Sequence, residues 1–253
     1  MTFPRVCQSD LEEQGFCLCP DFLAADQIEL LLQAIRPDEM AAGSTAKRGA
    51  AYGIRNLLWD RPDLAAALTS LGVDAVASSA LGGTAFPISA IFFDKNRSAN
   101  WMVGAHQDLV MPVESRQEIA GYSRWSEKLG VTYVEPPAEV LQRLIALRIH
   151  FDDCGADNGA LAVAPGSHTH GNLPQTAINE LEVAEFVICH AAAGDILLMK
   201  PLLVHRSSRA SNPARRRVLH VVYATEHPSP VLHWRTADLK KPQVGVLATD
   251  AHR

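Results

Sequence analysis

The sequence predicts a mainly β protein with flanking α-helices, arranged as a sandwich or barrel. Two observations favour this class. From about residue 85 onward, short apolar runs alternate with turn signals such as Asp157-Asn158-Gly159. Residues 1–82 instead carry apolar side chains at helical spacing. Many short strands with such turns are typical of sandwiches and barrels, and helices that precede them can pack on the outside.

Most of residues 1–82 should be helical and pack against the sheet. The first predicted helix places Ile28, Leu31, Leu32 and Ile35 on one face. The predicted ranges are 16–22 for an early strand, and 24–35, 62–70 and 74–81 for helices. Seven further strands are predicted at 85–94, 145–152, 160–164, 186–189, 195–199, 202–205 and 218–224.

A long insert, residues 109–140, separates two of these strands and is rich in Pro, Glu and aromatic residues. Segments of this length in a compact domain are usually lids or binding loops. We therefore expect a lid, with residues 123–129 as a short helix and Trp125 against substrate. The alternative is that its aromatic residues pack on the outside of the barrel.

The most informative motif is His106-Gln107-Asp108. Side chains at i and i+2 of one strand point the same way, so this histidine and carboxylate can face one metal ion. His205 is the candidate third ligand, because the apolar run 202–204 before it is typical of a buried strand. Two histidines and one carboxylate on one face of an octahedron leave other positions open, as in non-heme Fe(II) oxygenases.

An arginine accompanies the third ligand. After His205 the chain passes through a polar Asn-Pro turn and returns as an apolar strand that opens at Arg216. A guanidinium pairs bidentately with a carboxylate, so Arg216 can bind an acidic group beside the metal. We expect its neighbours Arg215 and Arg217 to be solvated.

Together these residues resemble the phytanoyl-CoA dioxygenase family of Fe(II)- and 2-oxoglutarate-dependent oxygenases, which includes the ectoine hydroxylases. The resemblance extends from about residue 92 to 223, with Gly15-Phe16 as a possible opening strand. The matching blocks are His106-Gln107-Asp108, Asn158-Gly159-Ala160-Leu161, Pro165-Gly166-Ser167-His168, Gly194-Asp195-Ile196-Leu197-Leu198, and His205 with Ser207, Asn212 and Arg216.

The resemblance implies a double-stranded β-helix, the cupin-like jelly-roll. It also implies Fe(II) held by His106, Asp108 and His205, with 2-oxoglutarate and O2 as co-substrates. Arg216 and Ser207 would bind the distal carboxylate of 2-oxoglutarate, with Gln107 also in the cofactor site. Hydroxylation or desaturation of an unactivated C–H of a small metabolite is expected, with release of succinate and CO2. Halogenation is disfavoured, because related halogenases carry a small residue in place of Asp108.

Candidate substrate residues lie on the strand 145–152, whose polar row contains Arg148 and His150. Inside a barrel this row would form a substrate wall, whereas outside it would face solvent. Arg148 is the better candidate, because a buried arginine needs an anionic partner. His168 and His220 are expected to be structural, and Lys95, Asn100 and Trp101 could line the 2-oxoglutarate pocket, although no spacing requires it.

Composition bounds the remaining possibilities. With 253 residues, 47% of them hydrophobic, the chain suits a single catalytic domain spanning 1–253. A net charge of −5 argues against nucleic acid as a partner. No stretch approaches the roughly 20 apolar residues of a membrane span, and residues 1–10 lack a signal-peptide core. Five scattered cysteines predict free thiols and a cytoplasmic location.

Two other classes remain open at this point. One is a non-catalytic cupin-like protein that binds a metal or ligand without turnover. The other is a non-redox cupin metalloenzyme that uses a metal such as Zn or Mn. The sequence identifies neither the substrate nor the oligomeric state, since one fold hosts many functions. Succinate formation would separate the three classes.

Overall fold

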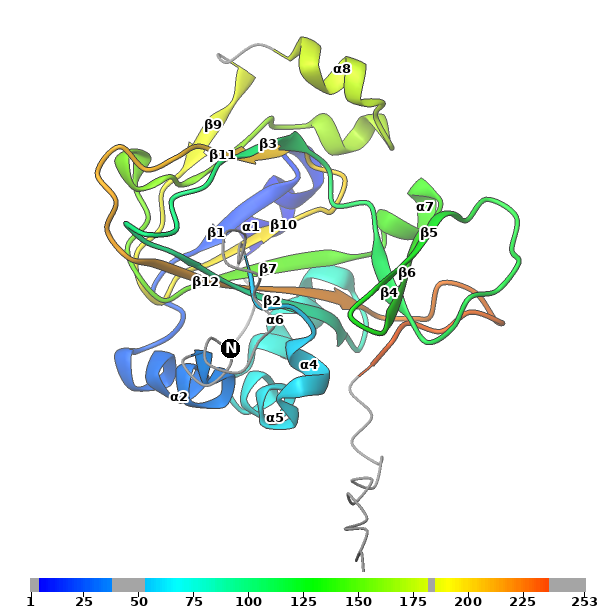
Figure 1. Ribbon diagram of the computed structural model, residues 1–253, viewed down its shortest axis with the longest axis horizontal. Coiled ribbons are helices and arrows are strands. Elements are labelled where there is room, and N and C mark those ends of the chain that lie inside the picture. The colour runs from blue at the N-terminus through cyan, green and yellow to red at the C-terminus, as the bar shows by residue number, and fades with distance from the viewer. Residues whose placement is uncertain (1–4, 38–52, 182–184, 237–253) are drawn as a thin grey trace, which may run out of the picture.

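Two antiparallel sheets face each other in the computed structural model, which describes residues 5–37, 53–181 and 185–236 (Figure 1). The larger sheet has the order β1 (Phe16–Cys19), β10 (Ile196–Met199), β7 (Ile145–His150), β12 (Arg216–Ala224), β2 (Phe86–Lys95). The smaller has the order β3 (Val103–His106), β11 (His205–Ser207), β8 (Leu161–Val163), β9 (Val187–Cys189). This confirms the predicted mainly β, jelly-roll class.

Helices cover the outer face of the larger sheet, as Figure 1 shows below β12 and β2. The helices of the N-terminal part are α1 (Arg5–Glu13), α2 (Ala25–Ile35), α4 (Leu57–Asp60), α5 (Pro62–Ser70) and α6 (Val73–Leu81). Shorter helices follow at α7 (Ala138–Leu141), η1 (Ala156–Asn158), η2 (Ser167–His170) and α8 (Gln175–Glu180). The predicted helices at 24–35, 62–70 and 74–81 are confirmed to within one residue at each end, whereas α1 was not predicted.

Alternation along β7 decides which side chains enter the space between the sheets. Ile145, Leu147 and Ile149 belong to the core that the helices form with the outer face. Because successive strand residues point to opposite faces, Arg148 and His150 face the other sheet. Both are buried, at 7% and 2% exposure. The polar row therefore lies inside the barrel rather than in solvent.

No single helix among the described residues is long and apolar enough to cross a membrane. The helices α5 and α6 reach the necessary length and composition only when counted together, and they are bent by 72° at the break between them. Leu64 and Leu68 of α5 and Val73 and Ala77 of α6 are fully buried in the core under the sheet.

The insert forms a third sheet of order β4 (Met111–Val113), β6 (Val131–Glu135), β5 (Ser123–Lys128), to the right in Figure 1. The predicted helix at 123–129 is wrong, because this segment pairs with β6 through a two-residue turn, Leu129-Gly130. Both turn residues have positive φ, 53° and 72°, as a tight hairpin requires. Met111 and Val134 are buried in the core, and closure of the insert over substrate stays a prediction.

Two further expectations are wrong. The strand predicted at 202–205 begins at His205 instead of ending there, because the preceding apolar run forms a buried turn in which the Leu203 N–H donates to the Lys200 carbonyl at 3.0 Å. Cys17 is disulfide-bonded, so the expectation of free thiols throughout does not hold. Cys154 and Cys189 are free and buried, and Cys19 is also buried.

Gly194 joins the N-terminal segment to the larger sheet. Its N–H donates to the His150 carbonyl at 2.8 Å, and its carbonyl accepts the Leu23 N–H at 3.0 Å. With φ at +96°, a Cβ at this position would overlap the carbonyl oxygen of Leu23. Only glycine fits here, because both the backbone conformation and the close approach of the second chain segment exclude a side chain.

Gly194→Ala should therefore destabilise the fold more than an alanine at another glycine of positive φ. The matched control is Gly130→Ala, since Gly130 has φ of +72° and open space around its Cα. The control should lose roughly 1–2 kcal/mol from its left-handed conformation. Gly194→Ala should lose a further ~1–3 kcal/mol through overpacking. Denaturant unfolding measures both losses, and equal losses would contradict the packing argument.

Candidate functional site

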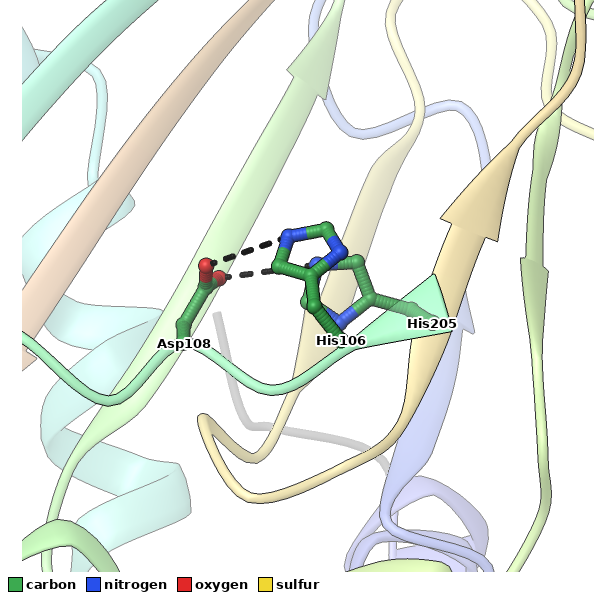
Figure 2. Close-up of side chains that lie close together, drawn as sticks. All are labelled: His106, Asp108 and His205. Carbon is green, nitrogen blue, oxygen red and sulfur yellow. Dashed lines mark ion pairs between the residues drawn. The ribbon is translucent and has the colours of Figure 1, made fainter. Parts of the chain in front are cut away.

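Three side chains from two strands and one loop converge where β3 and β11 pair (Figure 2). His106 is the last residue of β3, and His205, the first residue of β11, is its direct partner across the ladder. Asp108 lies just beyond β3, and its N–H donates to the Pro201 carbonyl at 2.9 Å. The Asp108 Oδ1 and Oδ2 atoms lie 3.8 Å from His106 Nε2 and 3.7 Å from His205 Nε2 respectively.

Backbone carbonyls orient both imidazole rings. Nδ1 of His106 lies 2.8 Å from the Gly104 carbonyl, and Nδ1 of His205 lies 2.9 Å from the Leu203 carbonyl. An Nδ1–H that donates to a carbonyl leaves the Nε2 lone pair free for a metal. The ligand atoms of the three residues lie within 4.8 Å of one another. The donor set, two imidazoles and one carboxylate on one side, therefore fits a divalent transition metal with open positions.

The charge states of these groups also suit a metal. Burial alone would raise the pKa of Asp108, but His205, His220, His106 and Arg148 outweigh it and lower the pKa to about 2. Burial lowers the pKa of His205 to about 4, against the opposing effect of Asp108. At neutral pH the site thus offers an ionised carboxylate and a neutral imidazole, which are the forms that coordinate metals.

His220 on β12 stands beside this group. Its Nε2 lies 3.6 Å from Asp108 Oδ2, and its Nδ1 lies 3.3 Å from Nη1 of Arg148. It does not belong to the group of ligand atoms that all lie within 4.8 Å of one another. His220 therefore forms part of the wall next to the candidate metal ligands. Local sequence pattern does not indicate this position, because it depends on the pairing of β12 with β7.

A cavity of about 270 Å³ opens onto the three candidate ligands. Its apolar wall includes Phe93, Trp101 and Leu161, and its polar wall includes Arg148 and Arg216. The complete lining is Arg55, Ile91, Phe93, Trp101, Met102, Val103, His106, Asp108, Arg148, Leu161, His205, Arg206, Ser207, Arg216 and His220.

Lys95, Ser207 and Arg216 form a cationic cradle away from the three candidate ligands. Arg216 pairs with Lys95 across β12 and β2, and both are buried, at 3% and 1% exposure. Nζ of Lys95 donates to Ser207 Oγ at 3.4 Å, and Nε of Arg216 has no partner. Burial and the charge of Arg216 lower the pKa of Lys95 to about 8, so it is still largely protonated at neutral pH. This cradle is suited to a carboxylate.

Three predicted site residues do not line the cavity. Gln107 donates to the Gly171 and Leu202 carbonyls at 2.8 and 2.6 Å and accepts the Leu173 N–H at 2.8 Å, so its amide group holds neighbouring segments of the chain in place. His150 is buried, at 2% exposure, and neither of its ring nitrogens has a hydrogen-bond partner. Trp125 lies on β5, where the Arg116 guanidinium carbon lies 5.7 Å from the centre of the Trp125 ring.

The sequence matches the phytanoyl-CoA dioxygenase (PhyH) family over residues 11–218. The chain belongs to this family. It is accordingly a 2-oxoglutarate-dependent non-heme iron oxygenase, and the cofactors of the family are Fe(II) and 2-oxoglutarate. No curated protein matches the chain.

Solved structures agree with the fold. AviO1 from Streptomyces viridochromogenes Tue57 is 22% identical, with 91% of this chain and 97% of that chain covered and a TM-score of 0.60. EctD from S. alaskensis with 2-oxoglutarate and 5-hydroxyectoine is 18% identical, with 88% and 76% covered and a TM-score of 0.65. The non-heme α-ketoglutarate-dependent carbocyclase SnoK from nogalamycin biosynthesis is 15% identical, with 87% and 83% covered and a TM-score of 0.62.

Metal binding should require His106, Asp108 and His205 together. Replacing any one with alanine removes one of three fixed donors, so each variant should fold yet retain little Fe(II) after anaerobic reconstitution and desalting. His170→Ala is the matched control, because His170 is an exposed histidine outside the group. Metal content per chain and circular dichroism measure the two properties. Full metal content in His205→Ala would show that a different residue completes the site.

Proposed function

We propose that the protein is a hydroxylase that inserts oxygen into an unactivated C–H bond of a small metabolite, with 2-oxoglutarate and O2 as co-substrates. The observation that supports this proposal is that two groups of side chains lie at one cavity. His106, Asp108 and His205 converge on one side, and Arg216 and Ser207 line another, with Lys95 hydrogen-bonded to Ser207. One group suits a metal and the other a carboxylate, and 2-oxoglutarate would bridge them.

In this proposal His106, Asp108 and His205 would hold Fe(II). When bound, the iron would supply oxidation of a C–H bond by O2, coupled to decarboxylation of 2-oxoglutarate. In the balanced reaction, substrate, O2 and 2-oxoglutarate yield hydroxylated substrate, succinate and CO2. Asp108 argues for hydroxylation rather than halogenation, because its carboxylate would fill the position that a halide needs.

Arg216 and Ser207 would hold the distal carboxylate of 2-oxoglutarate, and we add Lys95 to this set. The Arg216 guanidinium offers a planar fork of donors, and its Nε has no other partner. Without a ligand the Ser207 hydroxyl donates to the Gly159 carbonyl at 2.9 Å and accepts from Lys95, so it would turn its one O–H away from that carbonyl to donate to the carboxylate. These contacts would orient the co-substrate with its oxo acid end toward the metal.

The apolar wall has a separate role in the proposed reaction. Phe93 and Leu161 line the cavity, and a substrate beside them would displace water from the reacting C–H. Excluding water limits unproductive side reactions. We further propose that residues 1–253 form one catalytic domain. A cytoplasmic location without nucleic acid or membrane partners remains a prediction from the sequence.

Succinate release tests this function. Reconstituted with Fe(II), 2-oxoglutarate and O2, the protein should release succinate slowly alone and faster with a true substrate, whose mass should rise by one oxygen atom. Asp108→Ala is the control, because it removes one metal donor. A protein that binds metal but releases no succinate with any member of a broad metabolite library would contradict the proposed hydroxylation.

Arg216→Ala should weaken 2-oxoglutarate binding by roughly ten- to a hundredfold, because a charge-assisted pair is worth ~1.5–3 kcal/mol. Anaerobic titration of the metal-loaded protein measures the dissociation constant. Arg215→Ala is the neighbouring control, since Arg215 is exposed and pairs with Asp94 at 2.8 Å. A large loss in Arg215→Ala with none in Arg216→Ala would show that the register of β12 has been misassigned.

A further inference from the structure

Arg148 is a buried cation in the cavity that the proposed reaction does not use. It lies at the centre of the larger sheet, on β7, directly opposite His220 of β12. The centre of its guanidinium lies 5.8 Å from the Phe93 ring, and its Nη1 lies 3.3 Å from His220 Nδ1. Its Nε has no hydrogen-bond partner. The side chain thus contacts Phe93 and His220, and its Nε–H remains a donor that nothing in the described residues satisfies.

Other arginines of the chain show what a structural role looks like here. Arg217 pairs with Asp152 at 2.6 Å, Arg215 with Asp94 at 2.8 Å and Arg124 with Glu135 at 3.1 Å. Arg148 is more buried than any of these three, yet within the described residues it has no carboxylate at ion-pair distance. Leaving an arginine buried without an anion is costly, so a structural role alone does not account for it.

The charges of the assembled site point the same way. Fe(II) with the single charge of Asp108 and the two of 2-oxoglutarate leaves one negative charge, which Arg216 balances. Arg148 is then one positive charge in excess, and Lys95 adds to that excess. Arg55 and Arg206 also line the cavity, whereas Asp108 is the one carboxylate among the lining residues. The loaded site should therefore attract one more anion.

Arg148 also lies in a different place from the co-substrate cradle. His220, its partner across the ladder, is four residues beyond Arg216 on the same strand, about 13 Å at the usual rise of a strand. His220 in turn lies 3.6 Å from Asp108. Arg216 therefore lies at the end of the cavity away from the candidate metal ligands. Arg148 lies at the same height along the strands as those ligands.

We propose that Arg148 binds a carboxylate of the primary substrate, so that the substrate is a small organic acid. This rests on the proposed function and names the substrate class of the same site. The cavity of about 270 Å³ is slightly smaller than the usual range for ligand pockets and must also hold 2-oxoglutarate, so the acid must be small. Ile91 and Phe93 would contact the apolar part of the acid, with its C–H bond close to the candidate metal ligands.

Binding of matched acids and amides tests the proposal without turnover. The probes are aliphatic and aromatic monocarboxylic acids, each with its primary amide, titrated anaerobically into protein loaded with Fe(II) and saturating 2-oxoglutarate. Quenching of tryptophan fluorescence reports binding, because Trp101 lines the cavity. The best acid should bind roughly ten- to a hundredfold more tightly than its amide, as expected for one charge-assisted pair. A panel in which no acid outperforms its amide overturns the proposal.

Two variants assign that preference to Arg148. In Arg148→Gln the preference for acid over amide should vanish, whereas in Arg143→Gln it should persist, because Arg143 lies outside the cavity and pairs with Glu226. Arg148→Lys should retain part of the preference if the glutamine variant fails to fold. An unchanged acid preference in Arg148→Gln overturns the proposal, as does a loss of 2-oxoglutarate affinity equal to that of Arg216→Ala, which would make Arg148 a co-substrate contact.

The same samples separate this proposal from the proposed function. Acid-selective binding that depends on Arg148 supports the anion site whether or not succinate is released. Succinate release without acid-selective binding supports the oxygenase and overturns the assignment of Arg148.

Discussion

The antiparallel pairing of β3 with β11 is the constraint on which the site depends. It places His205 directly across from His106, although 98 residues lie between them in the chain, with their rings 4.3 Å apart. The turn before β11 contributes the Pro201 carbonyl that holds the Asp108 backbone. The pairing of these two strands thus fixes all three candidate ligands. Each imidazole is oriented by a hydrogen bond from its Nδ1 to a backbone carbonyl, of Gly104 for His106 and of Leu203 for His205. Side chains held by a sheet keep their geometry better than side chains on long loops.

Much of the fold follows from local pattern. Helix α5 occupies the predicted residues 62–70, and the strands β2 and β7 begin within one residue of their predicted starts. The failures have physical causes. The segment 123–129 contains good helix formers, but its pairing with β6 outweighs that propensity, and Leu129-Gly130 lacks the Asn-Gly or Asp-Gly signal of a tight hairpin. The apolar run 202–204 is buried in a turn, which apolar pattern alone does not distinguish from a buried strand.

Site residues that belong to local motifs could be predicted from the sequence. Site residues whose position depends on strand register were harder to predict. His106, Asp108, His205, Ser207 and Arg216 follow from motif spacing and resemblance, and the structure brings all five to one cavity. Gln107 points the other way, as strand alternation requires of the residue between two that face the cavity. The sequence allowed Lys95 near the co-substrate but could not require it, and it assigned His220 to structure. Both positions depend on which residues face each other across β12 and its neighbours.

The distribution of charge in the cavity also bears on how ligands arrive. The chain carries a net charge of −5, yet the lining of the cavity holds four arginines and a single carboxylate. A cleft of one sign with low-dielectric walls focuses its field outward and raises the local concentration of oppositely charged ligands. Anions should therefore be drawn to the mouth of the cavity while the surrounding surface repels them. Because ionic strength screens such fields over a Debye length of about 8 Å at physiological salt, capture of 2-oxoglutarate should slow as salt rises even where the final contacts are unchanged.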